Sequence, residues 1–175
     1  VKKLGFKSLI TSDPHEIRNA EKVIFPGVGE ASTAMNYLKE RNLDILIPTL
    51  KQPFLGICLG QQLLCDFSEE GNTKCLGIFN LKVKQFPPTD IVPHMGWNNL
   101  QKLQGPLLEG ISMEDNFYFV HSYYCEIGQN TTSECDYILP FSATLQKNNF
   151  YGTQFHPEKS GDVGSKILEN FLQLK

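Results

Sequence analysis

The chain has 175 residues, of which 41% are hydrophobic and 20% are charged, as is typical of one compact globular domain. Sixteen lysines and arginines against 19 aspartates and glutamates give a net charge of −3, which disfavours a nucleic-acid partner. No apolar run approaches the roughly 18 residues that span a membrane, and no signal-like segment opens the chain, so a membrane partner is disfavoured too.

The first half of the chain alternates short apolar runs with helical patterns. Strands are predicted at 7–11, 22–25 and 53–58, and helices at 30–40, 43–50 and 60–67. Strands that are separated by helices pair in parallel, so we expect a three-layer α/β fold with a mostly parallel sheet. Residues 1–5 instead resemble the end of a helix that is capped by Gly5. This pattern predicts that the first strand and most of a helix are missing from the chain.

The second half, from about residue 77, is mostly extended and broken by Pro and Gly. An aromatic strand is predicted at 117–125, and a hairpin at 142–146 and 151–155 with its turn at 147–149. An amphipathic helix is predicted at 163–174, with four residues inward: Ile167, Leu168, Phe171 and Leu172. We therefore expect an added antiparallel β region, and one domain over residues 1–175.

Five cysteines are spread along the chain as Cys58, Cys65, Cys75, Cys125 and Cys135. They form no CxxC pair, and an odd number cannot all pair within one chain. With no zinc-ligand spacing either, we expect reduced thiols, no metal and a cytoplasmic location. Four of the five fit as small apolar fillers or surface thiols.

Cys58 differs because it stands in Gly56-Ile57-Cys58-Leu59-Gly60, at a predicted strand-to-helix junction. A sharp turn there presents the thiol above the sheet, and flanking glycines allow close backbone approach. The N-terminus of the following helix favours the reactive thiolate, and the N–H of Leu59 is placed to bind an oxyanion. Alone, the motif is equally compatible with a buried core cysteine between two turn glycines.

His156-Pro157-Glu158 supplies the partners that such a cysteine needs. Pro157 favours an extended conformation at His156, and residues two apart in an extended segment share a side. Glu158 can therefore orient the imidazole of His156 as a general base. An isolated His-x-Glu is more often a loop histidine beside a surface glutamate, but the two motifs together favour a Cys58–His156–Glu158 triad.

Residues 56–62 (GICLGQQ) together with His156-Pro157-Glu158 resemble the class I, triad-type glutamine amidotransferases. More narrowly, the chain is similar to the glutaminase subunits of imidazole glycerol phosphate synthase, in three segments: 26–29 (PGVG), 93–98 (PHMGWN) and 120–124 (VHSYY). The resemblance implies glutamine hydrolysis through a Cys58 thioester, without a cofactor, in histidine biosynthesis. The products made by the assembled synthase would be imidazole glycerol phosphate and AICAR.

The resemblance also implies roles around the nucleophile. The oxyanion would be bound by Leu59 and by the 26–29 turn, at Val28 or Gly29. Gln62, one helical turn after Cys58, would face the substrate. Glu70 would meet its α-amino group, although a solvated helix-end charge is equally plausible. The remaining substrate contacts would come from Gly27, Gly29, His121, Ser122 and Tyr123. A packed strand with a structural histidine is the alternative for 121–123.

The partner implied is a (β/α)₈-barrel synthase subunit that consumes the ammonia. Its docking edge would be the segment Pro93, His94, Met95, Gly96, Trp97 and Asn98. The alternative is that Trp97 is a core aromatic on a β-hairpin. Other interpretations of the whole chain are a glutaminase of the anthranilate or GMP type, a cysteine-elbow hydrolase or chaperone, and a catalytically silent binding subunit.

Overall fold

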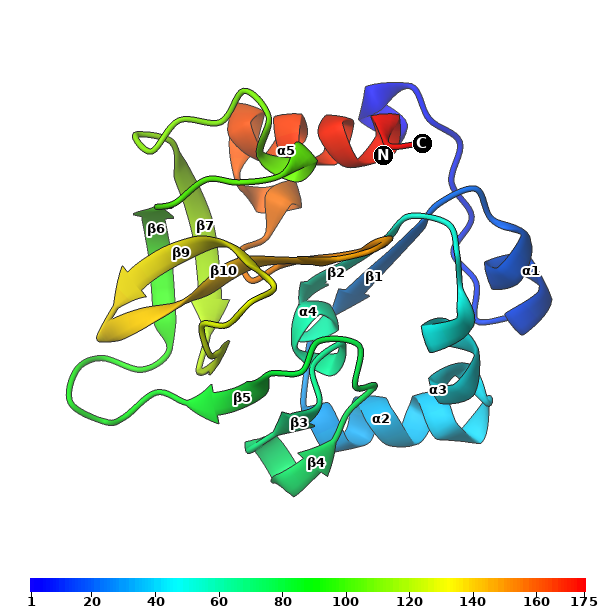
Figure 1. Cartoon of the computed structure of the whole chain (residues 1–175), viewed down its shortest axis with the longest axis horizontal. Coiled ribbons are helices and arrows are strands. Elements are labelled where there is room, and N and C mark those ends of the chain that lie inside the picture. The colour runs from blue at the N-terminus through cyan, green and yellow to red at the C-terminus, as the bar shows by residue number, and fades with distance from the viewer.

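A five-stranded sheet forms the centre of the molecule, in a computed structural model that describes all 175 residues (Figure 1). Its strand order is β1-β2-β11-β10-β9, with β1 at Val23–Gly27, β2 at Phe54–Cys58, β11 at Phe150–Thr153, β10 at Leu139–Lys147 and β9 at Thr131–Tyr137. The first three strands are parallel, and β10 and β9 run antiparallel to their neighbours. The predicted parallel sheet with an added antiparallel region is confirmed.

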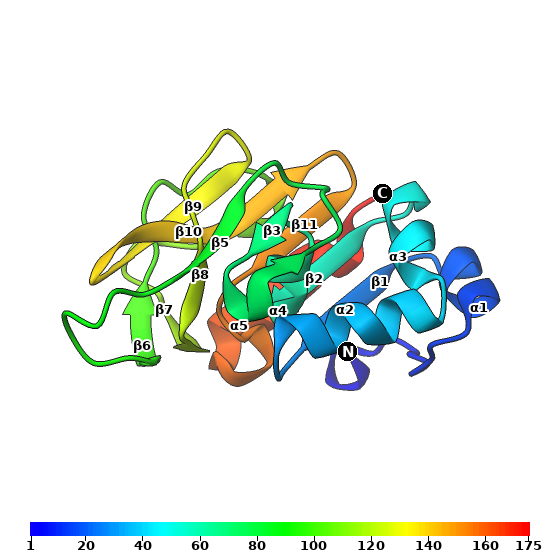
Figure 2. The ribbon, with the colours of Figure 1, turned by 90° about the horizontal axis from the view of Figure 1, so that it is seen from below.

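Helices cover both faces of this sheet, which makes the three predicted layers. On one side lie α2 (Ala31–Glu40), α3 (Leu43–Leu46) and α4 (Leu59–Leu63), and on the other lies α5 (Gly161–Gln173) (Figure 1). A fifth, peripheral helix, α1 (Pro14–Asn19), lies beyond the edge strand β1 (Figure 2). The short 3₁₀ turns are Lys2–Leu4, Ile47–Thr49, Glu70–Asn72, Pro106–Leu108 and Pro157–Lys159. None of the helices has the length and apolar character to cross a membrane.

Strand alternation divides the apolar side chains into two cores. Phe54 packs with α2, α3 and α4, whereas the next residue, Leu55, packs with α5. Phe150 and Tyr151 on β11 divide in the same way. Successive side chains on a strand point to opposite faces, so the central strands supply both cores. The inward face predicted for α5 is confirmed, because Ile167, Leu168 and Phe171 are buried.

Two smaller sheets flank the central one. A four-stranded sheet has the order β4-β3-β5-β8, with β4 at Thr73–Lys74, β3 at Phe67–Ser68, β5 at Lys82–Gln85 and β8 at Tyr123–Cys125. A separate antiparallel pair joins β6 (His94–Asn99) to β7 (Asn116–His121). Figure 2 shows this pair at the end of the molecule remote from α1 and α3.

Three sequence predictions were wrong in detail. Residues 7–11 form no strand, because no neighbour pairs with them and Ile10 is fully exposed. The strand predicted at 117–125 breaks at Ser122 into β7 and β8, which belong to different sheets. The helix predicted at 60–67 ends at Leu63, since the amides of Ile78 and Phe79 donate to the carbonyl of Leu64. The cap at Gly5 is confirmed, with φ 83°.

Candidate active site

Cys58 lies at a sharp strand-to-helix turn, where β2 ends and α4 begins. Its backbone has φ 54° and ψ −111°, which is a strained conformation for a residue with a side chain. Glycines make the turn possible. A Cβ at Gly60 would lie 2.0 Å from the carbonyl oxygen of Phe25, and one at Gly56 would lie 2.6 Å from that of Gly60. The G-x-C-x-G pattern therefore reflects backbone packing that no side chain permits.

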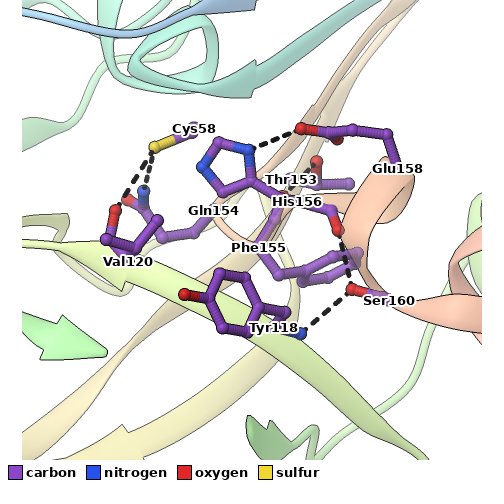
Figure 3. A network of polar contacts seen from close by, with 9 residues as sticks. All are labelled: Cys58, Tyr118, Val120, Thr153, Gln154, Phe155, His156, Glu158 and Ser160. Atoms are coloured by element: carbon purple, nitrogen blue, oxygen red, sulfur yellow. Dashed lines mark hydrogen bonds and ion pairs between the residues drawn. The ribbon is translucent and has the colours of Figure 1, made fainter. Parts of the chain in front are cut away.

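The turn points the thiol of Cys58 at two neighbouring segments. Its Sγ lies 3.9 Å from the carbonyl oxygen of Val120 on β7, and 3.7 Å from Nε2 of Gln154, which follows β11. The imidazole of His156 faces the same sulfur (Figure 3). The predicted nucleophile and the predicted base thus meet at the carboxyl ends of the adjacent parallel strands β2 and β11.

His156 is held between this sulfur and the acid of the predicted triad. Its Nδ1 lies 2.7 Å from Oε1 of Glu158, which leaves the other ring nitrogen facing Cys58 (Figure 3). Hydrogen bonds with the Cys58 sulfur and with Glu158 raise the pKa of His156 to about 9. Partial burial acts to raise the pKa of Glu158, but its hydrogen bond with His156, a hydrogen bond with its own backbone and the charges of His156 and Lys159 together outweigh this, and the net pKa is lowered. This pairing favours a charged imidazolium beside the sulfur.

The segment that carries His156 is fixed to β7 through both backbone and side chain. The N–H of His156 donates to the carbonyl of Tyr118 at 2.9 Å. The buried hydroxyl of Ser160 donates to the carbonyl of His156 at 2.7 Å and accepts from the N–H of Tyr118 at 3.0 Å. These bonds set the position of the imidazole. The roles of Tyr118 and Ser160 were missed by sequence reasoning, because both lie outside the recognisable motifs.

The turn at 26–29 lies directly beside Cys58. Gly27 is paired with Cys58 between β1 and β2, and a Cβ on Gly27 would lie 2.8 Å from the amide nitrogen of Gly60. Val28 points outward, with 86% of its surface exposed, and Gly29 has φ 105°. Leu59 is the first residue of α4, where amides lack an intrahelical acceptor. The structure therefore brings both predicted oxyanion-hole segments together.

Comparison with known proteins agrees with this geometry. The family described as "Glutamine amidotransferase class-I" matches residues 3–174. The chain belongs to this family. It is 55% identical to "Imidazole glycerol phosphate synthase subunit HisH" of Bacteroides fragilis (strain YCH46), over 99% of this chain and 90% of that protein. The protein of the same name from Vibrio cholerae is 44% identical, over 99% of this chain and 90% of that protein.

Solved structures show the same fold at low sequence identity. A glutamine amidotransferase crystal structure has a TM-score of 0.72 and 16% identity, and covers 97% of this chain and 89% of that chain. The crystal structure of a glutamine amidotransferase from Thermotoga maritima has a TM-score of 0.61 and 18% identity, over 98% of this chain and 68% of that chain. At these identities the likeness concerns the fold alone.

Two predicted substrate residues of the amidotransferase are partly engaged within the protein. Gln62 is buried, and its Nε2 donates to the carbonyl of Tyr123 at 2.8 Å and to Oε1 of Gln154 at 3.0 Å. Its own Oε1 accepts no hydrogen bond from the protein. Glu70 is half-buried, and its Oε2 accepts from the N–H of Ala31 at 2.8 Å. Burial raises the pKa of this carboxyl.

The 121–123 segment turns out to be more structural than the resemblance implies. His121 is buried, with Nδ1 2.7 Å from the carbonyl oxygen of Tyr123 and Nε2 3.1 Å from Nδ1 of His94. Both of its ring nitrogens thus form hydrogen bonds within the protein, as expected of a structural histidine in a packed strand. Burial lowers the pKa of His121 to about 3. Ser122 and Tyr123 are partly exposed at the break between β7 and β8.

The predicted docking segment of the amidotransferase divides into an inner and an outer face. His94 was expected at the interface, but its ring is buried within the chain, stacked 4.0 Å from Tyr137 and 4.8 Å from Phe119. Burial lowers the pKa of His94 to about 4. Met95 and Trp97 alternate with it and point outward, 63% and 58% exposed. Trp97 is therefore not a core aromatic.

The remaining residues of this segment frame that outer face. Pro93 is partly buried and precedes β6 after a cis peptide bond. Gly96 lies opposite Phe119 in the β6–β7 pair and has φ 141°. Asn98 donates from Nδ2 to the carbonyl of Asp136 at 3.0 Å, which ties β6 to β9. No cluster of three or more His, Cys, Asp or Glu side chains is placed to hold a metal ion.

Proposed function

We propose that this chain is the glutaminase subunit of imidazole glycerol phosphate synthase, and that Cys58, His156 and Glu158 are its catalytic triad. The observation that carries the catalytic assignment is the meeting of the strained Cys58 turn with the imidazole that Glu158 holds at 2.7 Å. The synthase assignment is supported by relatives of that name at 44% to 55% identity over 99% of the chain. The pathway would be histidine biosynthesis.

The first half of the reaction forms a thioester. The thiolate of Cys58 attacks the side-chain amide carbon of glutamine, so that a C–S bond forms and the carbonyl becomes an oxyanion. The intermediate collapses, the C–N bond breaks, and the imidazolium of His156 donates its proton to the departing nitrogen, which leaves as ammonia. The raised pKa of His156 suits this acid step, because it keeps the ring protonated at neutral pH.

The second half regenerates the enzyme. His156, now neutral, takes a proton from water, and the hydroxide attacks the thioester carbon. Collapse of this second oxyanion breaks the C–S bond and releases glutamate, while His156 regains its charge beside the thiolate. Glu158 orients the ring throughout.

The oxyanion of both intermediates would be held by two backbone amides. One is the N–H of Leu59 at the start of α4. The other comes from the 26–29 turn, at Val28 or Gly29. The pairing of Gly27 with Cys58 supports this role, since it keeps the turn beside the nucleophile.

The substrate would lie in front of the Cys58 turn. The free Oε1 of Gln62 can accept a hydrogen bond from the substrate glutamine. The Oε1 of Glu70, which makes no hydrogen bond within the protein, can bind the substrate's α-amino group. Gly27, Gly29, Ser122 and Tyr123 would complete the contacts. His121 supports this pocket through the carbonyl of Tyr123 and does not itself touch substrate.

A (β/α)₈-barrel synthase subunit would dock on the outer face of β6 and β7. Met95 lies opposite Val120, and Trp97 opposite Tyr118, so these four side chains share one face. The carbonyl of Val120 also contacts the Cys58 sulfur. This face is thus the outer side of a strand whose backbone contacts the nucleophile. Ammonia leaving Cys58 would then reach the partner, which forms imidazole glycerol phosphate and AICAR, without meeting bulk solvent.

We also propose that residues 1–175 form one domain. Its two cores share the central strands β2 and β11, since neighbouring residues on each strand pack into different cores. Because both cores are built on the same strands, one core cannot form without the other.

A glutaminase assay tests the assignment. Cys58→Ala should abolish ammonia release, because the covalent route disappears, while normal turnover by this variant would refute the triad. The wild-type chain should be slow alone and stimulated by the ligand-bound barrel protein. The synthase partners of the anthranilate or GMP pathways should not stimulate it. Equal stimulation by those partners would refute the synthase assignment.

A further inference from the structure

A hydrogen-bond chain with a fixed direction leads to the nucleophile. Its fixed point is the backbone carbonyl of Tyr123, because a carbonyl oxygen can only accept. The Nε2 of Gln62 lies 2.8 Å from that oxygen and must be the donor. The same –NH₂ group lies 3.0 Å from the Gln154 side chain, which must therefore present its oxygen to Gln62.

This constraint determines what the nucleophile faces. With Oε1 of Gln154 engaged by Gln62, the –NH₂ group of Gln154 is the part that points at Cys58, with Nε2 3.7 Å from Sγ. Gln154 is fully buried, and its backbone N–H is fixed to the carbonyl of Ala143 at 2.8 Å. Because the side chain is buried, its amide group cannot turn toward solvent instead.

The other side of Tyr123 extends the chain to β6. His121 lies 2.7 Å from the same carbonyl through Nδ1, so that nitrogen carries the proton. Its Nε2 is then an acceptor, and Nδ1 of His94 at 3.1 Å must donate to it. The carbonyl of Tyr123 thus accepts from both sides, and its acceptor role fixes the tautomers of both histidines.

We propose that Gln154 is a hydrogen-bond donor that stabilises the thiolate of Cys58, with Gln62 as the positioning residue that aims its amide. This inference rests on the proposed role of Cys58 as nucleophile. Two contacts of the sulfur compete. The carbonyl of Val120, at 3.9 Å, can only accept, so it stabilises the thiol. The amide of Gln154 donates, so it stabilises the thiolate together with His156.

The position of Gln154 explains why this role is available. It lies two residues before His156, and both side chains reach the Cys58 sulfur from the segment after β11 (Figure 3). The sulfur therefore has one charged and one neutral donor on the same segment. The neutral donor stabilises the thiolate together with the imidazolium before it attacks the amide, and again when collapse of the second oxyanion breaks the C–S bond and frees the thiolate.

The test measures the reactivity of Cys58 without glutamine. The rate of alkylation by iodoacetamide is followed against pH, and fragment mass spectrometry locates the modified residue, with Cys58→Ala as the background. The thiolate is the reacting form, so the midpoint of this profile reports its stability. Gln154→Leu should move the midpoint up by about one pH unit, because it removes one donor. An unchanged midpoint would overturn the proposal.

Gln61→Leu is the matched control. Like Gln154, Gln61 is a fully buried glutamine, but it lies on α4. Its Nε2 donates to the Cys125 sulfur and to the carbonyl of Ser142, not to Cys58. It should lower stability without moving the midpoint. If Gln61→Leu and Gln154→Leu moved the midpoint equally, the effect would be a general loosening of the core and the proposal would fall.

A second variant tests the aiming by Gln62 and remains informative if Gln154→Leu does not fold. Gln62→Leu frees the Gln154 amide to rotate, so it should move the midpoint in the same direction. The double variant should shift no further than Gln154→Leu alone, because both act through one bond. No shift in Gln62→Leu, or additive shifts in the double variant, would overturn the role of Gln62.

Turnover separates this inference from the proposed function. With the barrel protein present, Gln154→Leu should lower kcat for glutamine about tenfold at neutral pH and change KM little, in line with a one-unit shift. Failure of the wild-type chain to hydrolyse glutamine would refute the function while leaving the alkylation result interpretable. A changed KM with an unchanged kcat and midpoint would assign Gln154 to substrate binding instead.

Discussion

The side chains of His156 and Glu158 lie 2.7 Å apart but differ greatly in exposure, at 5% for the imidazole and 50% for the carboxylate. The acid therefore reaches a buried ring from the solvent side. Solvent screens its charge, so its main effect is to fix the ring orientation and tautomer. Geometry, more than charge strength, is what this residue contributes.

Glu158→Gln should lower kcat on the order of 100-fold, because an amide can hold the wrong tautomer and supports the imidazolium poorly. It should also lower the titration midpoint of His156, whose pKa of about 9 depends on the Cys58 and Glu158 hydrogen bonds. NMR of the histidine ring protons measures this. A His156 midpoint equal to that of the wild type would contradict the coupling.

The same pair makes stability depend on pH. The folded pKa of His156 lies above its unfolded value, so its contribution is complete below about pH 6.5 and is lost as pH rises to about 9. Glu158 has a lowered pKa, so its contribution is present at neutral pH and is lost in acid. Wild-type stability should therefore fall between pH 6.5 and 9 more steeply than that of His156→Gln, as urea unfolding would show.

Ser160→Ala should cost about 1–3 kcal/mol of unfolding free energy, since it leaves the buried N–H of Tyr118 and the carbonyl of His156 without their partner. It should also lower glutaminase activity, because His156 loses an anchor. Ser165→Ala is the control on the neighbouring helix. That hydroxyl bonds only the carbonyl of Gly161 at the surface, so the change should stay within about 0.5 kcal/mol.

His94→Phe should make the protein less sensitive to mild acid. The buried His94 has a pKa of about 4, so below pH 6.5 the unfolded chain takes up a proton that the folded protein refuses. Stability is then lost as pH falls, by up to about 1.4 kcal/mol per pH unit for this group. Phenylalanine preserves the stacking on Tyr137. Denaturant unfolding at a series of pH values gives the unfolding free energy of each protein. If the two free energies fell in parallel from pH 6.5 to 4, this prediction would be contradicted.

Gly60→Ala should cost about 3 kcal/mol or more, because the added methyl overlaps the carbonyl of Phe25 and neither backbone can move freely. Gly5→Ala is the control, since a Cβ there meets nothing within 4 Å. Its φ of 83° alone should cost about 1 kcal/mol. Thermal unfolding compares the two, and similar losses would show that the Cys58 turn tolerates a side chain.

Much of this architecture is readable from local patterns. The apolar runs before Gly27 and Cys58 and the helical face of Ala31, Met35 and Leu38 are each set by their own sequence, and the structure contains these elements. The Gly56–Gly60 and 156–158 motifs carried the family resemblance for a similar reason. Contacts within a few positions explain Gly56 and the pairing of His156 with Glu158, whereas Gly60 also depends on the distant carbonyl of Phe25.

Long-range contacts explain what the sequence did not reveal. His94 and Met95 are adjacent in one motif, yet they face opposite ways, and only the pairing with β7 decides which faces inward. Gln154 offers no local pattern beyond its place two residues before His156. Its role follows from Gln62, 92 positions away. Residues 7–11 have the composition of a strand, but a strand also needs a neighbour.

The separation of β6 and β7 from the other sheets has a mechanical consequence. No ladder joins this pair to the central sheet, yet β7 accepts from the backbone of His156 and contacts the sulfur of Cys58. An isolated two-stranded ribbon is weak by itself, so it is held in place by its buried aromatic rings. A partner that presses on this ribbon would therefore shift the positions of Cys58 and His156 directly, and a small displacement of the ribbon should lower activity while the rest of the molecule stays folded.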